Sequence, residues 1–406
     1  MDFKFAHMAD LHLGGWRDSE LNRISLETFE DSMDACITEK VDFILISGDL
    51  FDTSMPSFDV LDIVSKKLNQ VRQAGIPVYT ISGSHDFSPS GKTILKVLEN
   101  AELIKDVARG EEKDGKLRLT FTTDKKTGAK LTGIFGRKGQ LDDVYYEHLD
   151  RSIEKEPGFK IFLFHSGIEE FKPGYLKDVR AMPLSLMPKN FDYYAGGHIH
   201  HGGEYDFHQR KMVFPGPLFP CNFQEFEKLG SGGFYIVKVK AGKISAEFRE
   251  IKKYDSKIVR IDADKKSAKN VESETMKTLG SLKLENTILL LKVSGVLSEG
   301  KPSDIDFRTI ANEAVSKGAK VVKKSISGLS SKEFKEIKIR PDSIENLERE
   351  VIKEHLGQYK TGLAKTAEPE LIHAIMTGMD LEKMEGETVP VFEARVLEKG
   401  YQLVKK

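Results

Sequence analysis

The sequence predicts a layered α/β fold with a second, smaller α/β module and a helical C-terminal tail. Short apolar runs alternate with helix-like segments through the first half of the chain, which is typical of layered α/β domains. The alternation restarts after Tyr254, and beyond Pro341 the chain becomes helical and charged. The length of 406 residues exceeds what one hydrophobic core usually supports, so more than one domain is expected.

Five apolar runs are expected to form strands of the large domain, because each ends in glycine or polar residues. They cover residues 3–9, 41–47, 76–82, 160–164 and 191–195. Helices are expected between the first three runs, over residues 20–39 and 58–74. Apolar residues recur at helical spacing from Val60 to Val71, so one face of the second helix should pack on the sheet. Gly75 is a suitable stop for that helix.

The second half of the chain supplies a hairpin, a strand pair and the smaller module. The hairpin is expected over residues 111–136, where residues 116–122 and 130–135 flank a turn-prone segment. The strand pair is expected over residues 233–240 and 243–251. The module then follows as strand, helix, strand, helix and strand over residues 258–261, 270–279, 287–293, 306–316 and 320–325. The predicted domains are residues 1–253, 254–340 and 341–406.

The composition limits the class of protein without indicating a partner. Lysine and arginine total 62 against 63 aspartate and glutamate residues, so any contact with nucleic acid must come from local patches. The two cysteines, Cys36 and Cys221, lie far apart without metal-type spacing and are expected to be ordinary thiols. We see neither a signal-like N-terminus nor an apolar run of membrane-spanning length, and therefore expect a cytoplasmic protein without membrane contact.

Nearly every predicted strand of the first half ends at a potential metal ligand. In chain order these residues are Asp10, His12, Asp49, Ser84, His85, His165, His198 and His200. Ligands of open α/β sheets bind beyond the carboxyl ends of the strands, so the five segments are expected to converge. Each residue alone has an ordinary explanation as a turn or core residue, and only their joint occurrence predicts a metal site. The remaining histidines fit no such pattern and are His7, His148, His201, His208, His355 and His373.

A pair of metal ions needs a bridging carboxylate, and Asp49 is the natural bridge. The terminal ligands would be Asp10, His12, His165, His198 and His200. Nitrogen and oxygen ligands without thiolate suit manganese, iron or zinc, and manganese fits an oxygen-rich, replaceable site. The metals would polarise a phosphate and lower the pKa of a bridging water. His85 lies beyond the ligand position, and we expect it to protonate the leaving oxygen or to stabilise charge on the phosphate.

These motifs resemble the motif series of calcineurin-like metallophosphoesterases. The series consists of Asp10-x-His12, Gly48-Asp49, Gly83-x-His85-Asp86, His165 and Gly197-His198-x-His200. Residues 9–14, 48–52 and 214–217 are more narrowly similar to the SbcD-type repair nucleases and their archaeal and eukaryotic meiotic-recombination counterparts. The motifs cover residues 1–250, and the remainder resembles these nucleases by layout, as a small capping domain followed by a helical tail.

The resemblance implies a ligand set, an activity and partners. Asp10, His12, Asp49 and His200 would hold one metal, and Asp49, Ser84, His165 and His198 the other. The implied activity is manganese-dependent processing of DNA double-strand breaks with two Mn²⁺ per chain, as an exonuclease on duplex ends and an endonuclease on single strands or hairpins. The implied partners are DNA, a coiled-coil ATPase of the ABC/SMC-like type and a second copy of the chain, at the nucleoid.

Two residues depart from the pattern of this family. Ser84 stands where the superfamily generally has asparagine, and its shorter neutral oxygen ligand is expected to hold the second metal less well. Asp52 stands where many archaeal and eukaryotic members have histidine, although bacterial SbcD-type members share the aspartate. We assign Asp52 to catalysis beside His85 and leave the balance between exonuclease and endonuclease action open.

Two surfaces and two rival functions remain open. The lysine-rich segment 317–340 favours contact with phosphates, with an ordinary solvated lysine face as an equal alternative. The narrow apolar stripes at 344–356 and 371–379 favour docking on a partner coiled coil, or else packing on their own domain. The rival functions are a phosphoesterase acting on small phosphodiesters or phosphoproteins, and a catalytically weakened scaffold that tethers DNA.

Overall fold

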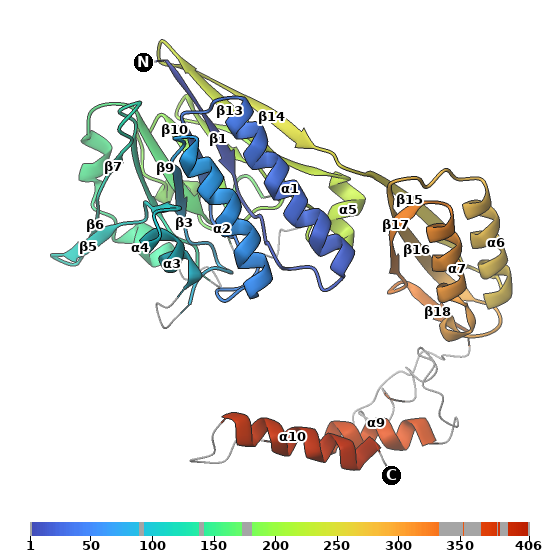
Figure 1. The fold of residues 1–406 in the computed structure, drawn as a ribbon. Coiled ribbons are helices and arrows are strands. Elements are labelled where there is room, and N and C mark those ends of the chain that lie inside the picture. Colours follow the sequence, from blue (N-terminus) through green and yellow to red (C-terminus); the bar gives the residue numbers. More distant parts are fainter. Residues whose placement is uncertain are drawn as a thin grey trace. The chain divides into compact units, whose positions relative to one another are not determined.

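The chain divides into two units, Met1–Ser256 and Lys257–Lys406 (Figure 1). This computed structural model describes residues 2–88, 93–137, 142–172, 181–332, 352, 367–379, 381 and 389–404. The first division falls close to the boundary expected after residue 253, whereas the boundary expected after residue 340 lies outside the described residues.

The first sheet of the N-terminal unit has six strands in the order β14-β13-β1-β2-β3-β4. These strands are β1 (Phe3–Met8), β2 (Phe43–Ser47), β3 (Val78–Ile81), β4 (Lys105–Asp106), β13 (Gly232–Lys240) and β14 (Lys243–Ile251). Strands β1 to β4 are parallel, and β13 and β14 extend the sheet as an antiparallel pair. Strands β2 and β3 are buried along their whole length, because both faces of the sheet are covered, and their sequences are therefore apolar without alternation.

The second sheet has the order β11-β12-β10-β9-β8-β7 and packs face to face on the first. Its strands are β7 (Thr122–Thr123), β8 (Lys130–Ile134), β9 (Lys160–His165), β10 (Tyr193–Gly197), β11 (Gly203–Phe207) and β12 (Arg210–Phe214). Aromatic rings fill the space between the sheets. Phe5 stacks on Phe43 with 4.9 Å between ring centroids, and Tyr193 of the second sheet meets Phe5 edge-on at 5.2 Å. The site therefore depends on two sheets rather than on one open sheet.

Helices cover the outer faces of this sandwich, which confirms the predicted layered α/β fold. The helices α1 (Ser19–Thr38), α2 (Phe58–Gln73) and α3 (Ile94–Asn100) pack on the first sheet, where α1 and α2 lie side by side (Figure 1). Helix α1 begins where the Asp18 carboxylate accepts from two backbone N–H groups, and α2 begins where the Ser57 hydroxyl accepts from Val60 N–H. The second sheet is covered by short segments, among them α4 (Asp143–Glu147).

The hairpin expected over residues 111–136 is only partly correct. Strands β7 and β8 do pair across the expected turn. Strand β6 (Lys116–Leu119), however, pairs with β5 (Gly110–Lys113) in a separate two-stranded ribbon. Leu117 also exchanges backbone hydrogen bonds of 2.8 Å with His148 and Asp150, so β6 is held by residues distant in sequence. Local patterns cannot reveal such a partner.

The C-terminal unit contains the expected small α/β module. Its elements are β15 (Asp255–Asp262), α6 (Ala268–Gly280), β16 (Thr287–Leu297), α7 (Phe307–Ser316), β17 (Ala319–Ser325) and β18 (Leu329–Ser331). The sheet order is β15-β16-β17, and β18, which the sequence did not suggest, also pairs with β16. Leu289 and Leu291 of β16 pack in one core with residues of both helices.

Two further helices follow in the tail, α9 (Ala367–Gly378) and α10 (Val389–Val404). They pack closely, because a side chain added at Gly378 would lie 2.7 Å from Leu403 Cδ1. The second predicted stripe falls on α9, whereas the first stripe (Ile344, Leu347, Val351 and Leu356) lies outside the described residues. Within the described part of the chain, no helix is both long enough and apolar enough to cross a bilayer.

Candidate metal centre

The predicted ligands lie at the carboxyl ends of strands from both sheets. Asp10 and His12 follow β1, Asp49 follows β2, Ser84 and His85 follow β3, His165 ends β9, and His198 and His200 follow β10. The sandwich brings the ends of β2 and β9 together, and the side chains of Asp49 and His165 are in contact there. The structure therefore gathers residues from five separate segments at one place.

The backbone at this place is strained. Asp10, His12, Asp49 and His198 have φ values of 54°, 44°, 52° and 84°. Residues other than glycine rarely adopt positive φ, and such strain concentrates at functional sites. Side chains also have little space around His165, because a Cβ atom added at Gly136 would lie 2.6 Å from the His165 ring. Residues of the loops after β1, β2 and β10 are thus held in conformations that their own sequences do not favour.

The first group of ligand atoms surrounds His12 Nε2. This atom lies 3.1 Å from His200 Nε2 and 3.6 Å from Asp49 Oδ2. His200 Nε2 lies 3.8 Å from Asp10 Oδ1. The other oxygen of Asp10, Oδ2, is buried without a hydrogen-bond partner among the described residues. A buried carboxylate oxygen normally has a partner, so this oxygen fits a role as metal ligand.

Hydrogen bonds on the far side of each ring fix the histidine tautomers. His12 Nδ1 lies 3.2 Å from Asp52 Oδ1, and His200 Nδ1 lies 2.9 Å from Glu225 Oε1. Ionised carboxylates only accept, so both Nδ1 atoms carry hydrogen, and the neutral form of each ring presents the Nε2 lone pair to the centre. The two Nε2 atoms lie 3.1 Å apart, so the neutral rings can share a proton or a metal ion but cannot face each other with lone pairs alone. Metal-binding histidines are held by carboxylates in this way.

The second group surrounds the other side of Asp49. His165 Nδ1 donates to the Ser47 carbonyl at 2.8 Å, and His165 Nε2 lies 3.1 Å from Asp49 Oδ2, where a proton or a metal ion on the nitrogen satisfies the carboxylate. Ser84 Oγ lies 3.4 Å from the same oxygen. The His198 ring contacts the His165 ring, with 5.2 Å between centroids. Asp49 is therefore shared by both groups, which is the position of a bridging ligand.

Electrostatics in the centre favour cations. Burial raises the pKa of Asp49, but His165 and His12 outweigh it and hold this pKa well below its usual range. Burial lowers the pKa of His165, but Asp49 and Asp10 raise it more, to about 10. Burial, together with His165, lowers the pKa of His198 to about 4, so its ring is neutral at neutral pH. A proton therefore competes with a metal ion for the nitrogen of His165.

His85 and Asp52 form a pair at the edge of the centre. His85 Nδ1 donates to the Asp52 carbonyl at 2.8 Å, and its side chain is 40% exposed. The hydrogen bond leaves His85 Nε2 for a substrate. The Asp52 carboxylate accepts from His12, which lowers its pKa against the opposing effect of burial. Asp52 thus contacts His12 through its carboxylate and His85 through its backbone carbonyl, and its assignment to catalysis stays a prediction.

Two further residues support the centre: sequence reasoning missed Glu225, and it named Asp86 in the motif series without giving it a role. Glu225 of α5 (Phe223–Leu229) accepts from His200. Its signal was the capping pattern of Asn222 followed three residues later by glutamate. Asp86 accepts from the backbone N–H groups of Leu50, Phe51 and Gly83 and so joins the loops after β2 and β3. Burial and the charge of Asp49 raise the pKa of Asp86 to about 6.

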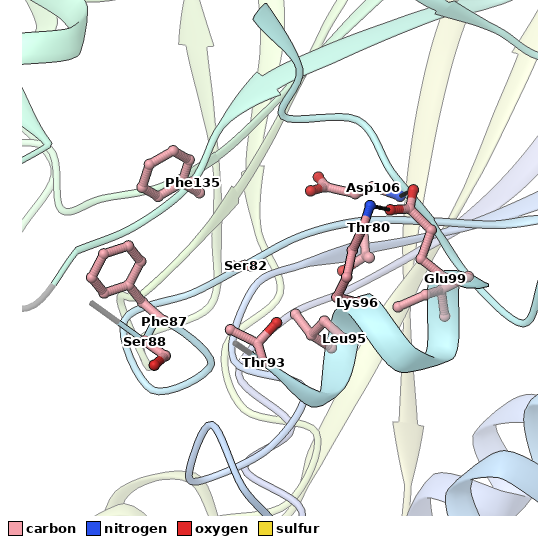
Figure 2. A pocket seen from close by; sticks show the side chains of 11 residues that line it. Thr80, Ser82, Phe87, Ser88, Thr93, Leu95, Lys96, Glu99, Asp106 and Phe135 are labelled. Atoms are coloured by element: carbon pink, nitrogen blue, oxygen red, sulfur yellow. Dashed lines mark hydrogen bonds and ion pairs between the residues drawn. The ribbon is translucent and has the colours of Figure 1, made fainter. Parts of the chain in front are cut away.

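A pocket with a volume of about 210 Å³ opens beside the loop after β3 (Figure 2). The parallel rings of Phe87 and Phe135, 5.8 Å apart, lie on one side, and Glu99 and Asp106 lie on the other. None of the predicted metal ligands lines this pocket. Glu99 accepts from Lys96 and from the backbone N–H of Asp106, so it is satisfied within the chain. The pocket is therefore a neighbour of the metal centre and not part of it.

Comparison with known proteins agrees with this geometry. Residues 3–202 match the family of calcineurin-like phosphoesterases. The uncharacterized metallophosphoesterase YhaO of Bacillus subtilis (strain 168) is 31% identical over 264 residues, which cover 61% of this chain and 60% of that protein. The DNA double-strand break repair protein Mre11 of Methanopyrus kandleri is 26% identical over 264 residues, covering 61% of this chain and 57% of the relative.

Another repair protein of the same name, from Methanococcus maripaludis, is 28% identical over 305 residues, which cover 70% of this chain and 75% of the relative. The match thus spans less than two thirds of the length of the first two relatives. The matched segment of the family contains every predicted metal ligand from Asp10 to His200. The chain therefore carries a calcineurin-like metallophosphoesterase domain.

Proposed function

We propose that the protein is a DNA nuclease that processes double-strand breaks with two Mn²⁺ per chain. The observation that carries this proposal is the sharing of Asp49 between two groups of ligand atoms, with His85 at the edge of the same centre. One metal would be held by Asp10, His12, Asp49 and His200, and the other by Asp49, Ser84, His165 and His198. The Mre11 repair proteins among the relatives support DNA as the substrate.

The chain's own residues would divide the work at a phosphodiester. The bound metals supply Lewis acidity and lower the pKa of water. His85 is held by Asp52 at Nδ1 and carries the proton for the leaving oxygen at Nε2. The backbone N–H of His85 donates to Asp49 Oδ1 at 2.7 Å, which ties the position of the acid to the shared carboxylate. The partly exposed His85 ring is where the substrate would enter.

Two surfaces support contact with larger partners. Lys320, Lys324 and Lys332 are exposed on the small module. Lys323 and Lys324 are neighbours on β17 and so face opposite sides, which limits the shared phosphate-binding face to part of the predicted segment. Its other basic residues (Lys335, Lys338 and Arg340) lie outside the described residues.

The partner surface would lie on α10. Leu397, Tyr401 and Val404 recur at helical spacing there and are 64%, 68% and 63% exposed. An exposed apolar row on a helix suits a coiled-coil partner, and we propose the coiled-coil ATPase for this face. A second copy of the chain is the further proposed partner.

The test follows nucleotide release from end-labelled duplex and single-stranded DNA with Mn²⁺ present. The native chain is compared with His85→Ala, and with His148→Ala as a control on an exposed histidine of the same unit. We expect His85→Ala to lower the rate about 10²- to 10⁴-fold, which is typical for loss of a general acid, and His148→Ala to retain it. Hydrolysis of a small phosphodiester without cleavage of either DNA would replace the nuclease by a general phosphodiesterase.

A further inference from the structure

Cys221 lies beside the metal centre, although its sequence position suggested an ordinary thiol. Its Sγ atom and ring nitrogens of His12 and His200 all lie within 4.8 Å of one another. Three potential ligand atoms at such distances suit a single cation. The other cysteine, Cys36 of α1, is fully buried in the apolar core and has no such neighbours among the described residues. The two thiols of this chain therefore have different chemical surroundings.

The position of Cys221 is fixed by the residue that also fixes His200. Glu225 accepts from the backbone N–H of Cys221 at 2.8 Å through Oε2, and from His200 Nδ1 at 2.9 Å through Oε1. The Glu225 carboxylate therefore fixes the position of Cys221 relative to the His200 ring. The thiol donates to the Phe219 carbonyl at 3.4 Å, an ordinary distance for the weak hydrogen bond of a thiol.

Space is available around the thiol. A small cavity of about 30 Å³ is lined by Cys221, His12, Asp52, Trp16 and Phe219, among others. This volume is comparable to that of one water molecule. This space adjoins both Cys221 and His12, so there is room for a small ion beside the thiol.

The donor type at this place decides which cations it favours. Carboxylates and imidazoles suit Mn²⁺, whereas a thiolate favours softer cations such as Zn²⁺. We propose that Cys221 is a metal ligand, and that Zn²⁺ or a similarly soft divalent cation binds His12, His200 and the Cys221 thiolate. On binding, a sulfur–metal bond forms and the thiol proton passes to water. This inference rests on the proposed metal centre and is independent of cleavage of DNA.

The proposal makes Cys221 a determinant of metal selectivity. Mn²⁺ would occupy the centre through oxygen and nitrogen ligands alone, and a soft cation would gain the sulfur as an extra ligand. Loss of the sulfur therefore weakens Zn²⁺ binding much more than Mn²⁺ binding. We expect Cys221→Ser to lower the affinity for Zn²⁺ at least about tenfold, the loss that even a residue supporting a ligand produces.

The experiment uses Co²⁺ as a spectroscopic probe on the full chain after removal of metals by a chelator. Thiolate bound to Co²⁺ absorbs in the near ultraviolet, and imidazole and carboxylate ligands do not produce this band. We expect the band in the native chain and in Cys36→Ala, and its absence in Cys221→Ser. Added Zn²⁺ should remove the band, because it displaces Co²⁺.

A second readout covers the case in which a variant fails to fold. The native chain is alkylated with and without Zn²⁺, and the modified peptides are counted by mass spectrometry. Protection of Cys221 by Zn²⁺, but not by Mn²⁺, is expected. A band that persists in Cys221→Ser, no band in the native chain, or equal alkylation with and without Zn²⁺ would each overturn the proposal. If the native chain cleaves DNA with Mn²⁺ but shows no Co²⁺ band, only the proposal for Cys221 is wrong. If the band is present but DNA is not cleaved, only the proposed nuclease function is wrong.

Discussion

Single side chains outside the predicted ligand set hold the histidines in position. Glu225 and Asp52 are the acceptors behind His200 and His12, and both carboxylates have pKa values below their usual range because those histidines favour the ionised form. Each carboxylate selects the tautomer in which Nε2 faces the metal centre. Carboxylates that are not metal ligands therefore also contribute to metal binding, because they fix the tautomers of the ligand histidines.

Replacement of Glu225 by glutamine tests this contribution. The variant keeps the shape of the side chain but removes the charge that favours the Nδ1–H tautomer of His200. We expect the affinity for Mn²⁺ to fall about 10- to 100-fold, measured by competition with a metal-binding dye. The exposed Glu147→Gln of α4 serves as the control and should leave the affinity unchanged. Equal Mn²⁺ affinities of the native chain and Glu225→Gln would show that the Glu225 charge does not contribute to metal binding.

The burial of His7 leads to a prediction that stability depends on pH, independently of metal binding. It is fully buried between Tyr193 and Ser47, with hydrogen bonds of 2.9 Å at both ring nitrogens, and burial lowers its pKa to about 3. The unfolded chain has the ordinary value near 6.5 and binds a proton that the folded chain does not bind. Stability therefore falls as pH drops from 6.5 toward 3, by up to about 1.4 kcal/mol per pH unit.

The measurement compares urea unfolding of the native chain and His7→Gln at pH 7.5 and pH 5, with a chelator present. Glutamine does not titrate, so the variant should lose less stability on acidification than the native chain. The same pH dependence in both proteins would show that His7 does not titrate differently in the folded and unfolded states.

At the scale of elements, the sequence predicts the strands and helices well where one periodic pattern covers a whole element. The ends of β1, β2 and α2 lie within a few residues of the expected positions, because burial on both faces gives each strand a continuous apolar run and burial of one face gives α2 a helical spacing. The convergence of the ligands was predictable for the same reason, since each ligand directly follows a buried strand. The β5–β6 ribbon is a local hairpin around Asp114-Gly115, a turn signal that sequence reasoning did not use, whereas β18 and the role of Glu225 depend on partners distant in sequence.

Asp86 links two of these elements and gives a prediction at this scale. Its buried carboxylate accepts three backbone N–H groups from the loops after β2 and β3, and an amide cannot accept on both sides. We expect Asp86→Asn to lower the free energy of unfolding by about 1–3 kcal/mol, because a buried N–H loses its acceptor. Urea unfolding measures the change, with the exposed Asp59→Asn as a control that should stay within about 0.5 kcal/mol. An unchanged stability of Asp86→Asn would contradict this role.

At the scale of the whole molecule, the two units have separate cores, and all predicted metal ligands lie in the first. A ligand that binds only one folded unit stabilises only that unit, by about 2.7 kcal/mol at a concentration one hundred times its Kd. Calorimetry should therefore resolve two unfolding transitions, and Mn²⁺ should raise the midpoint temperature of only one of them. A single transition that Mn²⁺ shifts as a whole would show that the units unfold together.

The central claim is that Asp49 is shared by two metal ions. Diffraction data collected at the manganese absorption edge, from crystals grown with Mn²⁺, test this claim most directly. The geometry predicts two anomalous peaks on either side of Asp49, one in contact with His12 and His200 and the other with His165 and His198. A single peak, or two peaks that do not share Asp49, would contradict the account.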